Sequence, residues 1–510
     1  MHRRSPFLLL LIPFLTACNA PSNAPRSTLA FTEQDLRLTA EAILRATPPA
    51  TMDLPTNTPS SQGGYAVWPT LIPTASGDNY EYQTLPGDTL AGLSGRFGVE
   101  AHTITVSSAN ALEEYLISGQ PLTILRQPGQ VSSAQRLLPD SELVYSSSAE
   151  DFDVFAFVNE AGGYLSKYHE KVRDEEQESS GADILQRVAN ELSVNPRLLL
   201  AILEYRSGWI YSHPLGAEQE RYPIGFRIPD RQGLYEELKI VATQLNLAYY
   251  GWRAGSFTEL RFEDSATLRL DPTLNAGSVA LMHLFALDSK SPDWEQDLYS
   301  PYGFPVKTFN LFGDAWARDR AHGPLIPADL EQPDLELPFL PREGWSLTAG
   351  PHNAWNAGTP LGALDLSPIT AEEPCGPSAT WVTASAPGVV VRARDHVVAL
   401  DLDGDDYEGS GWVIVYYHIA EQDMIPEGLS LGVDQRLGHP SCEGGIASGT
   451  HVHLARKYNG EWMAADGPVP FLLSGWRAVA GERIYAGQLV KGDQTVTADP
   501  AGRAGSTILR

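Results

Sequence analysis

The hydrophobic and polar positions of this chain follow one period in its middle and another towards its end. Apolar residues recur at helical spacing in residues 182–209, 234–253 and 273–287. Within the first of these segments, Asn195-Pro196 predicts the end of one helix and the start of another. Beyond residue 340, short alternating or β-branched runs bounded by glycine and proline predict strands. The pattern therefore predicts a mainly α-helical middle domain and a strand-rich C-terminal region.

Residues 80–126 alternate shorter strand-like and helix-like pieces. A Pro-Gly-Asp-Thr turn predicts a helix with Asp88 or Thr89 as its N-cap, and Gly98 predicts where that helix ends. A second helical piece begins in residues 104–110, before a turn and a last strand.

This order resembles a LysM module, whose βααβ fold binds the N-acetylglucosamine of peptidoglycan or chitin. The resemblance implies that the loops of the module contact glycan, through Gly87, Asp88, Thr89 and Asn110. A LysM fold that serves only as a spacer is the alternative. The positions that match the module are Gly87, Asp88, Thr89, Leu90, Asn110, Gly119 and Gln120.

Three stretches differ in composition from the segments around them. Residues 19–79 are rich in Pro, Thr, Ser and Asn, and apart from one candidate amphipathic helix at 31–47 they cannot bury enough apolar surface to fold. Residues 127–150 predict a second linker, and the Pro-rich acidic residues 326–343 predict a third. After Trp476 the alternation predicts closing strands of the same domain.

The N-terminus has the features of an export signal. A basic start is followed by an apolar run that is too short to span a membrane comfortably. The run ends in Leu-Thr-Ala-Cys18, which resembles a bacterial lipobox and implies a lipid on Cys18 that anchors the chain to a membrane. The alternative is an ordinary secretory signal with an incidental cysteine. Both interpretations place the chain outside the cytoplasm, lipid-anchored to the cell membrane or secreted.

The net charge of the chain restricts the classes of partner that it is expected to bind. It has 36 Lys and Arg against 63 Asp and Glu, a formal net charge of −27. This balance argues against a nucleic-acid partner and against simple attraction to anionic wall polymers. Nothing in the sequence indicates a protein partner.

Titratable residues stand in the apolar strand segments near the C-terminus. His451 and His453 are two residues apart, so in a strand they share one face while Val452 turns into the core. Such a pair alone is also common on surface strands. A buried His or Asp is costly unless it is paired or bound to a metal, so a set of them indicates a metal site. Further short segments flanked by Gly and Pro contain His352, Asp365 and His418.

These segments resemble the lysostaphin-like zinc metallopeptidases of bacterial cell-wall lysis, in particular the branch of the β-lytic and staphylolytic endopeptidases. The resemblance extends over roughly residues 340–478 and implies an all-β domain built on an antiparallel sheet. The matching segments are GPH at 350–352, ALDLS at 363–367, APGVVV at 386–391, VYYHI at 415–419, GHPSCEGG at 438–445 and GTHVHLA at 449–455.

The resemblance assigns a role to each of the five residues. It implies that His352, Asp365 and His453 hold Zn²⁺ and leave a position for water. His451 would orient or deprotonate this water, and His418 would donate to the oxyanion of the tetrahedral intermediate. The implied reaction is hydrolysis of peptide cross-bridges in peptidoglycan, with the LysM module concentrating the enzyme on the wall. A catalytically silent wall-binding or regulatory protein is the alternative, which the complete histidine set disfavours.

The chain contains three cysteines. If Cys18 carries lipid, Cys375 and Cys442 remain as a pair, and an oxidising exterior permits a disulfide between them. The bond would staple the loops around the metal site. Two free thiols too far apart to bridge are the alternative.

The helical middle domain distantly resembles the lysozyme-like lytic transglycosylases, which makes Glu204 the candidate acid and a bifunctional hydrolase a second alternative. That family has Glu directly before Ser, whereas Tyr205 and Arg206 intervene here. We therefore favour a structural role for Glu204.

Composition and motifs together predict a multidomain chain. Its seven expected parts are a lipoprotein signal at 1–18, a linker at 19–79, a LysM module at 80–126, a linker at 127–150, a helical domain at 151–335, a zinc metallopeptidase domain at 336–478, and closing strands with a tail at 479–510.

Overall fold

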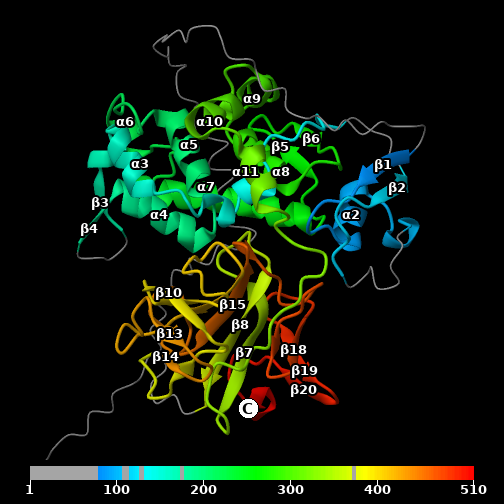
Figure 1. Cartoon of the computed structure of the whole chain (residues 1–510), viewed down its shortest axis with the longest axis vertical. Helices are drawn as coiled ribbons and strands as arrows, with labels where there is room; N and C mark the ends of the chain where they lie inside the picture. The colour runs from blue at the N-terminus through cyan, green and yellow to red at the C-terminus, as the bar shows by residue number, and fades with distance from the viewer. Residues whose placement is uncertain (1–78, 106–113, 126–130, 173–176, 370–374) are drawn as a thin grey trace, which may run out of the picture.

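The chain forms a small N-terminal unit, a helical region and a β region, which Figure 1 shows with the helical region above the β region. This computed structural model describes residues 79–105, 114–125, 131–172, 177–369 and 375–510. Within these ranges, no helix combines the length and the apolar character that a membrane span requires. The expected signal, the spacer and the candidate helix at 31–47 lie outside the described residues.

The N-terminal unit is a two-stranded antiparallel sheet with a helix packed on it. This helix begins and ends as predicted, because the Thr89 side chain accepts a hydrogen bond from Gly92 N and Gly98 closes the helix in the left-handed conformation. Most of the second helix expected for a LysM module falls in residues 106–113, outside the described ranges, so that assignment stays a prediction. The elements are β1 (Asn79–Gln83), α2 (Leu90–Phe97) and β2 (Pro121–Leu125).

The N-terminal unit docks on the C-terminal end of α7 (Leu234–Arg253) in the helical region. The Arg253 guanidinium donates a hydrogen bond to the Pro86 carbonyl. Gly95 approaches the carbonyl oxygen of Gly255 so closely that a Cβ atom at Gly95 would lie 2.1 Å from it. Glycine is therefore required at this contact, and the two parts pack backbone against backbone.

The helical region confirms the helices that were predicted from apolar periodicity. The Asn195 side chain caps α5, and Pro196 occupies the first turn, so the predicted break falls at Asn-Pro. Every residue of α8 is buried, which places this helix at the centre of the region. The helices are α3 (Val154–Ala161), α4 (Gly181–Leu192), α5 (Pro196–Ser207), α6 (Ala217–Arg221), α7, α8 (Ala276–Ala286), α9 (Ser291–Tyr299), α10 (Phe304–Phe312) and α11 (Ala315–His322); the small hairpins are β3 (His169–Lys171) with β4 (Glu178–Ser180) and β5 (Glu259–Arg261) with β6 (Thr267–Arg269).

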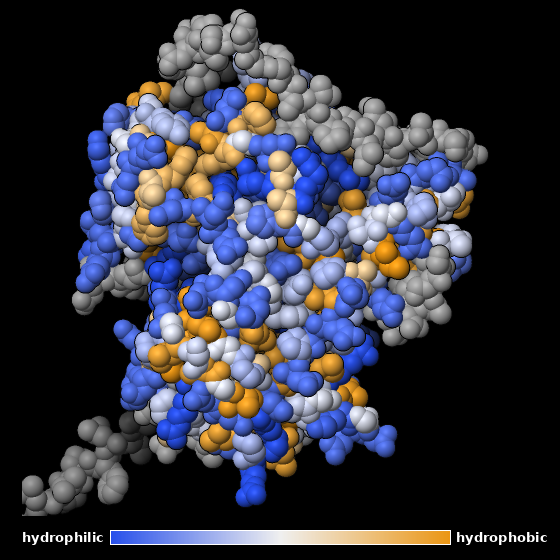
Figure 2. All heavy atoms as spheres, viewed as in Figure 1, coloured by the Kyte–Doolittle hydropathy of each residue, from blue (hydrophilic) through white to orange (hydrophobic). Residues whose placement is uncertain are grey.

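The surface of the chain is mainly hydrophilic on the face drawn in Figure 2, in keeping with its large negative charge. Apolar side chains nevertheless gather over the helical region near α3 and α10. The exposed members of these two helices include Phe155 and Phe309.

The linker predicted at 127–150 is wrong for the part that the structure describes. Leu143 and Val144 are fully buried, and both belong to the same apolar cluster as α4, α5, α7 and α8. The Asp140 carboxylate accepts hydrogen bonds from Asn275 Nδ2 and Gly277 N, both at 2.7 Å, which ties the segment to the start of α8. Its serine-rich composition suggested a linker, but tertiary contacts make it part of the helical region.

The β region is built on one antiparallel sheet of nine strands, as the resemblance implied. Its strand order is β13-β10-β11-β12-β15-β8-β7-β21, with β16 paired to β15. Residues after Trp476 form closing strands of this region, as predicted, because β18 to β20 pair with one another and β21 pairs with β7. The strands are β7 (Gly344–Asn353), β8 (Leu361–Pro368), β9 (Val382–Thr383), β10 (Gly388–Arg394), β11 (Val397–Asp401), β12 (Trp412–Tyr417), β13 (Ser430–Leu431), β14 (Arg436–Gly438), β15 (Val452–Tyr458), β16 (Glu461–Trp462), β17 (Leu472–Leu473), β18 (Trp476–Ala480), β19 (Gly487–Lys491), β20 (Gln494–Thr497) and β21 (Thr507–Leu509).

The two faces of the nine-stranded sheet belong to different apolar cores. Ile414 and Leu454 pack into the core of the β region itself. Their strand neighbours Val413, Val415 and Ala455 turn the other way and join the core of the helical region. One face of the sheet is therefore covered by helices, and the two regions share a continuous apolar interior.

The linker predicted at 326–343 is also wrong in part. Leu337 and Phe339 are fully buried in the core of the β region, and Phe339 stacks on Trp345 with ring centroids 5.1 Å apart. Glu336 N donates to the Ser385 carbonyl at 2.8 Å. The proline and acidic residues of this stretch suggested a linker, but its apolar residues pack as an extended segment of the β region.

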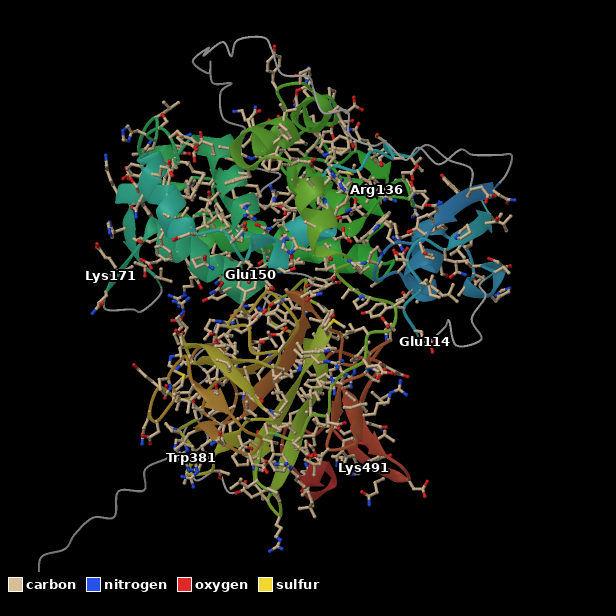
Figure 3. All side chains as sticks on the ribbon, viewed as in Figure 1. Glu114, Arg136, Glu150, Lys171, Trp381 and Lys491 are labelled. Carbon is tan, nitrogen blue, oxygen red and sulfur yellow. A yellow bond between two sulfur atoms is a disulfide. The ribbon has the colours of Figure 1, made fainter. Side chains whose placement is uncertain are left out.

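Charged side chains are buried where the helical region meets the sheet, a boundary that side chains fill in Figure 3. Lys457 is fully buried and its Nζ lies 2.6 Å from Glu408 Oε1 and 3.4 Å from the Asn190 carbonyl of α4. Arg253 of α7 pairs with Glu461 at 3.2 Å. A buried charge without its partner is strongly destabilising, so Lys457 depends on Glu408. The Lys457–Asn190 bond and the Arg253–Glu461 pair join the two regions.

Replacing Glu408 tests that contribution. Glu408→Gln leaves the buried Arg392 and Lys457 without a countercharge, and we expect the free energy of unfolding to fall by about 3–5 kcal/mol. Burial opposes ionisation of Glu408, but Arg392 and Lys457 lower its pKa from 4.5 to about 2. Its contribution is therefore complete above the unfolded-state pKa and is lost as the pH falls from 4.5 towards about 2.

Denaturant unfolding at pH 7 and at low pH measures this difference, with the exposed Glu259→Gln as the matched control. Equal stability of the two variants at pH 7 would contradict the account of this boundary.

Candidate active site

Three titratable side chains converge on one point at the helix-covered face of the sheet. His352 comes from β7, Asp365 from β8 and His453 from β15, which are neighbouring strands. His352 Nε2 lies 3.0 Å from His453 Nδ1 and 3.2 Å from Asp365 Oδ1, and His453 Nδ1 lies 3.3 Å from the same oxygen. The β15–β8 register places His453 directly opposite Asp365. The strands thus bring together residues that are 101 positions apart in the chain.

These three atoms fit the shell of a zinc ion. Zinc binds nitrogen and oxygen ligands at about 2.0–2.2 Å in a tetrahedron, which sets neighbouring ligand atoms about 3.3 Å apart. Asp365 Oδ1 is buried without a hydrogen-bond partner among the described residues, a costly state that a bound cation relieves. Burial acts to raise the pKa of Asp365, but the facing His352 and His451 hold it well below its ordinary value. The carboxylate is therefore ionised, as a metal ligand must be.

Backbone carbonyls fix the orientation of both histidines. The Nδ1 atom of His352 donates to the Gly350 carbonyl at 2.9 Å, and Nε2 of His453 donates to the Ala354 carbonyl at 3.0 Å. A carbonyl can only accept, so each ring carries its proton on the outer nitrogen. The inner nitrogens, Nε2 of His352 and Nδ1 of His453, keep lone pairs that face the metal position.

His451 and His418 stand beside this group without belonging to it. Their ring centroids are 4.6 Å apart, and His451 Nε2 is 3.7 Å from Asp365 Oδ2. His451 donates from Nδ1 to the Gly449 carbonyl at 2.7 Å, and His418 donates from Nδ1 to the Glu443 carbonyl at 2.8 Å. The neutral form of each ring therefore offers Nε2 as a proton acceptor.

The predicted donor role of His418 requires a protonated Nε2. Burial, reinforced by His451, lowers the pKa of His418 to about 3, so its ring is neutral near pH 7. His418 can donate to an oxyanion only after it has accepted a proton. The role of each histidine stays a prediction, and the strand predicted for His418 ends one residue before it, at Tyr417.

The histidines line a cleft of about 1170 Å³ between the β region and the helical region. Tyr485 stacks on the ring of His352 with centroids 4.7 Å apart, and Trp355 and Tyr417 pack together at 4.8 Å. Sequence reasoning missed these residues. Tyr417 directly precedes His418, which was a usable signal, but Tyr485 comes from a late segment that carries none. The helical wall of the cleft includes Arg187, Glu191, Arg231, Lys239, Thr243 and Gln244.

A disulfide joins the loops beside the cleft. Cys375 and Cys442 are bonded, with Cα atoms 5.1 Å apart, as the sequence predicts. Thr450, next to His451, donates from Oγ1 to the Gly376 carbonyl at 2.8 Å. The bond and this contact hold the segment that leads into the H-x-H strand.

Glu204 lies on α5 and does not line the cleft. Its Oε2 accepts a hydrogen bond from Ile210 N at 3.0 Å, which holds the turn after the helix. Burial raises its pKa, and the Ile210 contact opposes that rise. These contacts support the structural role favoured from the sequence.

The structure describes three of the four residues expected to contact glycan in the N-terminal unit. Asp88 is buried, accepts a hydrogen bond from Tyr82 and pairs with Arg96. Gly87 is covered by the Arg253 side chain, and Thr89 caps α2. The Asp88 carboxylate and Gly87 are therefore covered in this structure, whereas Thr89 is half-buried and its contact with glycan stays a prediction. Asn110 and Cys18 lie outside the described residues.

Comparisons with known proteins find relatives of this chain. A family model described as LasA, N-terminal domain, matches residues 136–324. The chain is 29% identical over 360 residues to Protease LasA of Pseudomonas aeruginosa strain UCBPP-PA14, which covers 66% of this chain and 77% of that protein. It is 25% identical over 158 residues to Beta-lytic metalloendopeptidase of Lysobacter enzymogenes, covering 30% of this chain and 82% of that one.

Among solved structures, the M23 metalloprotease pseudoalterin matches with 22% identity and a TM-score of 0.29, covering 35% of this chain and 99% of the other. The similarity to curated endopeptidases and the metal-binding geometry together identify a zinc-dependent metalloendopeptidase. The helical region matches a domain of LasA, and its resemblance to lytic transglycosylases stays a prediction.

Two substitutions, one in β15 and one directly before it, separate metal ligand from catalyst. His453→Ala removes one of three ligands, and we expect zinc to be lost on dialysis. His451→Ala should keep near-stoichiometric zinc while the hydrolysis rate falls by about 10²–10⁴-fold, the usual contribution of an acid–base group. Elemental analysis measures the zinc content of each variant, and hydrolysis of a cross-bridge peptide measures its rate.

The two substitutions control for each other, because they lie two residues apart on the same face. Zinc loss from His451→Ala with retention in His453→Ala would reverse the assigned roles. Full zinc content and full activity in both variants would remove this pair from the site.

Proposed function

We propose that the chain is an extracytoplasmic peptidoglycan hydrolase that cuts peptide cross-bridges of the bacterial cell wall. The observation that carries the proposal is the group of His352, Asp365 and His453, with His451 and His418 beside it, in the lining of a large cleft. The similarity to Beta-lytic metalloendopeptidase supports the endopeptidase part of this proposal.

The chemistry follows from the donor atoms. Bound zinc supplies a Lewis acid and lowers the pKa of a coordinated water to about 7. His451 accepts the proton of the attacking water at Nε2, the nitrogen that its bond to Gly449 leaves free. The departing amine needs a proton, and a histidine that has taken one from water can return it. The ring of His418 lies close to that of His451, so it can take part in this proton transfer. Once protonated, His418 donates to the oxyanion.

The N-terminal unit would concentrate the enzyme on its polymer if it binds glycan. The βα…β arrangement of β1, α2 and β2 is compatible with that role. Asp88 and Gly87 are covered in this structure, so binding would use Thr89 or other residues of the unit. Lipid anchoring through Cys18 completes the proposal and would hold the chain at a membrane surface.

Glycan cleavage by the helical region is the second candidate, and the structure favours it less. Its candidate acid, Glu204, lies outside the cleft and its carboxylate is engaged by Ile210 N.

Mass analysis of the muropeptides released from purified cell walls tests the proposal. We expect products with new termini inside the cross-bridge, and no such products from His451→Ala. Glu204→Gln is the matched control in the helical region and should release the same products as the unchanged chain. Anhydro-muropeptides that disappear in Glu204→Gln would instead establish glycan cleavage, and intact walls after treatment with a zinc-loaded chain would exclude peptidoglycan as the substrate.

A further inference from the structure

The hairpin formed by β7 and β8 contains two of the three zinc-site residues and contacts the third. His352 lies near the end of β7, and Asp365 lies in β8. The carbonyl of Ala354, in the hairpin turn, accepts the hydrogen bond from Nε2 of His453. The position of this turn therefore sets the spacing of two ligands and the ring orientation of the third.

The turn is closed by its own hydrogen bonds. Ala354 N donates to the Pro360 carbonyl at 2.9 Å. Thr359 Oγ1 donates to the Asn356 carbonyl at 2.8 Å and accepts from Trp355 N at 3.1 Å. Because these bonds tie the tip to its base, a displacement of Asn356 carries the Ala354 carbonyl with it.

Helix α7 of the helical region holds the tip of this hairpin. Asn356 Nδ2 donates to Thr243 Oγ1 at 2.7 Å, and Thr243 is buried. Gly358 has a φ of 99°, and a Cβ there would lie 2.9 Å from Leu247 N of α7. The hairpin thus meets α7 in direct contact, with no space for a side chain.

The bond to Thr243 is what orients the Asn356 amide. The other end of that amide, Oδ1, is buried without a hydrogen-bond partner among the described residues. A buried amide with one satisfied end depends on that end, because loss of the bond leaves both polar atoms unpaired.

We propose that α7 positions the zinc ligands through this hairpin, and that Thr243 and Asn356 are positioning residues of the metal site. The path runs from Thr243 to Asn356, through the closed turn to the Ala354 carbonyl, and from there to Nε2 of His453. The helical region is then part of the catalytic apparatus as well as a wall of the cleft. This inference rests on zinc at the site and does not depend on which peptide is cut.

The proposal predicts the size of the effect. Replacing a partner that orients a metal-bound histidine typically weakens metal affinity by about 10–100-fold. Thr243 acts on such a partner indirectly, through Asn356 and the turn, so we expect Thr243→Val to weaken zinc binding by about 10-fold, the lower end of that range. Thr243→Ser keeps the hydroxyl and should restore the affinity.

The experiment measures the zinc dissociation constant of the purified full chain by competition with a chelator. Ser193→Ala is the matched control, because the Ser193 hydroxyl is buried and also bonds across the boundary, to the Gly460 carbonyl at 2.6 Å, beyond the far end of β15. We expect its dissociation constant to be unchanged. In the metal-free protein, amide exchange in residues 353–360 should be faster in Thr243→Val than in Ser193→Ala.

Each outcome decides the question. An unchanged dissociation constant in Thr243→Val overturns the proposal, and so does an equal loss in Ser193→Ala, which would reflect a general loosening of the boundary. If Thr243→Val does not fold, Gly358→Ala provides the second variant, because its methyl group pushes the hairpin from α7; unchanged zinc affinity there also overturns the proposal. None of these readouts involves peptidoglycan, so they stand apart from a failure of the proposed substrate.

Discussion

A charged carboxylate, Asp365, stands on a buried face of the sheet, and the structure around it depends on making that charge tolerable. Leaving an ionised group in an apolar interior without compensation costs several kcal/mol. His352 and His453 approach one of its oxygens within 3.3 Å, and His451 faces the other. That first oxygen still has no hydrogen-bond donor among the residues described, and a cation at this point satisfies it together with both imidazoles. The buried Asp365 carboxylate would destabilise the fold without a cation, and it therefore favours metal binding.

The same face of the sheet serves two purposes along its length. At one end of β15 it presents His453 to the cleft, and two residues further on Ala455 packs into the core of the helical region. Small side chains let the helices lie close to the strands, and buried polar contacts such as Arg253 with Glu461 and Lys457 with the Asn190 carbonyl join the two regions. The cleft is consequently formed by both regions, and its geometry depends on how firmly they are joined. That dependence is the physical reason why a helix can influence a metal site on a neighbouring sheet.

Local signals predicted much of this arrangement. The Asn195-Pro196 break depends on neighbouring residues and falls where it was expected. Of the predicted H-x-H strand pair, His453 lies in β15 and His451 directly precedes it. Long-range packing was not predictable. Phe339 stands in a Pro-rich acidic stretch and Leu143 in a serine-rich one, yet both are buried, because partners far away in the chain provide their apolar surroundings. Tyr485 reaches His352 only through the fold, and Asp88 was expected at a sugar-binding loop but serves an internal ion pair.

Anomalous diffraction at the zinc absorption edge, from crystals of the chain grown with one equivalent of zinc, tests the central claim most directly. The account predicts one strong peak within bonding distance, about 2.0–2.2 Å, of His352 Nε2, Asp365 Oδ1 and His453 Nδ1. His451 and His418 should stand outside the shell with Nε2 turned towards it. A peak bonded to His451 or His418 in place of one of these three, or no peak at this position, would contradict the account.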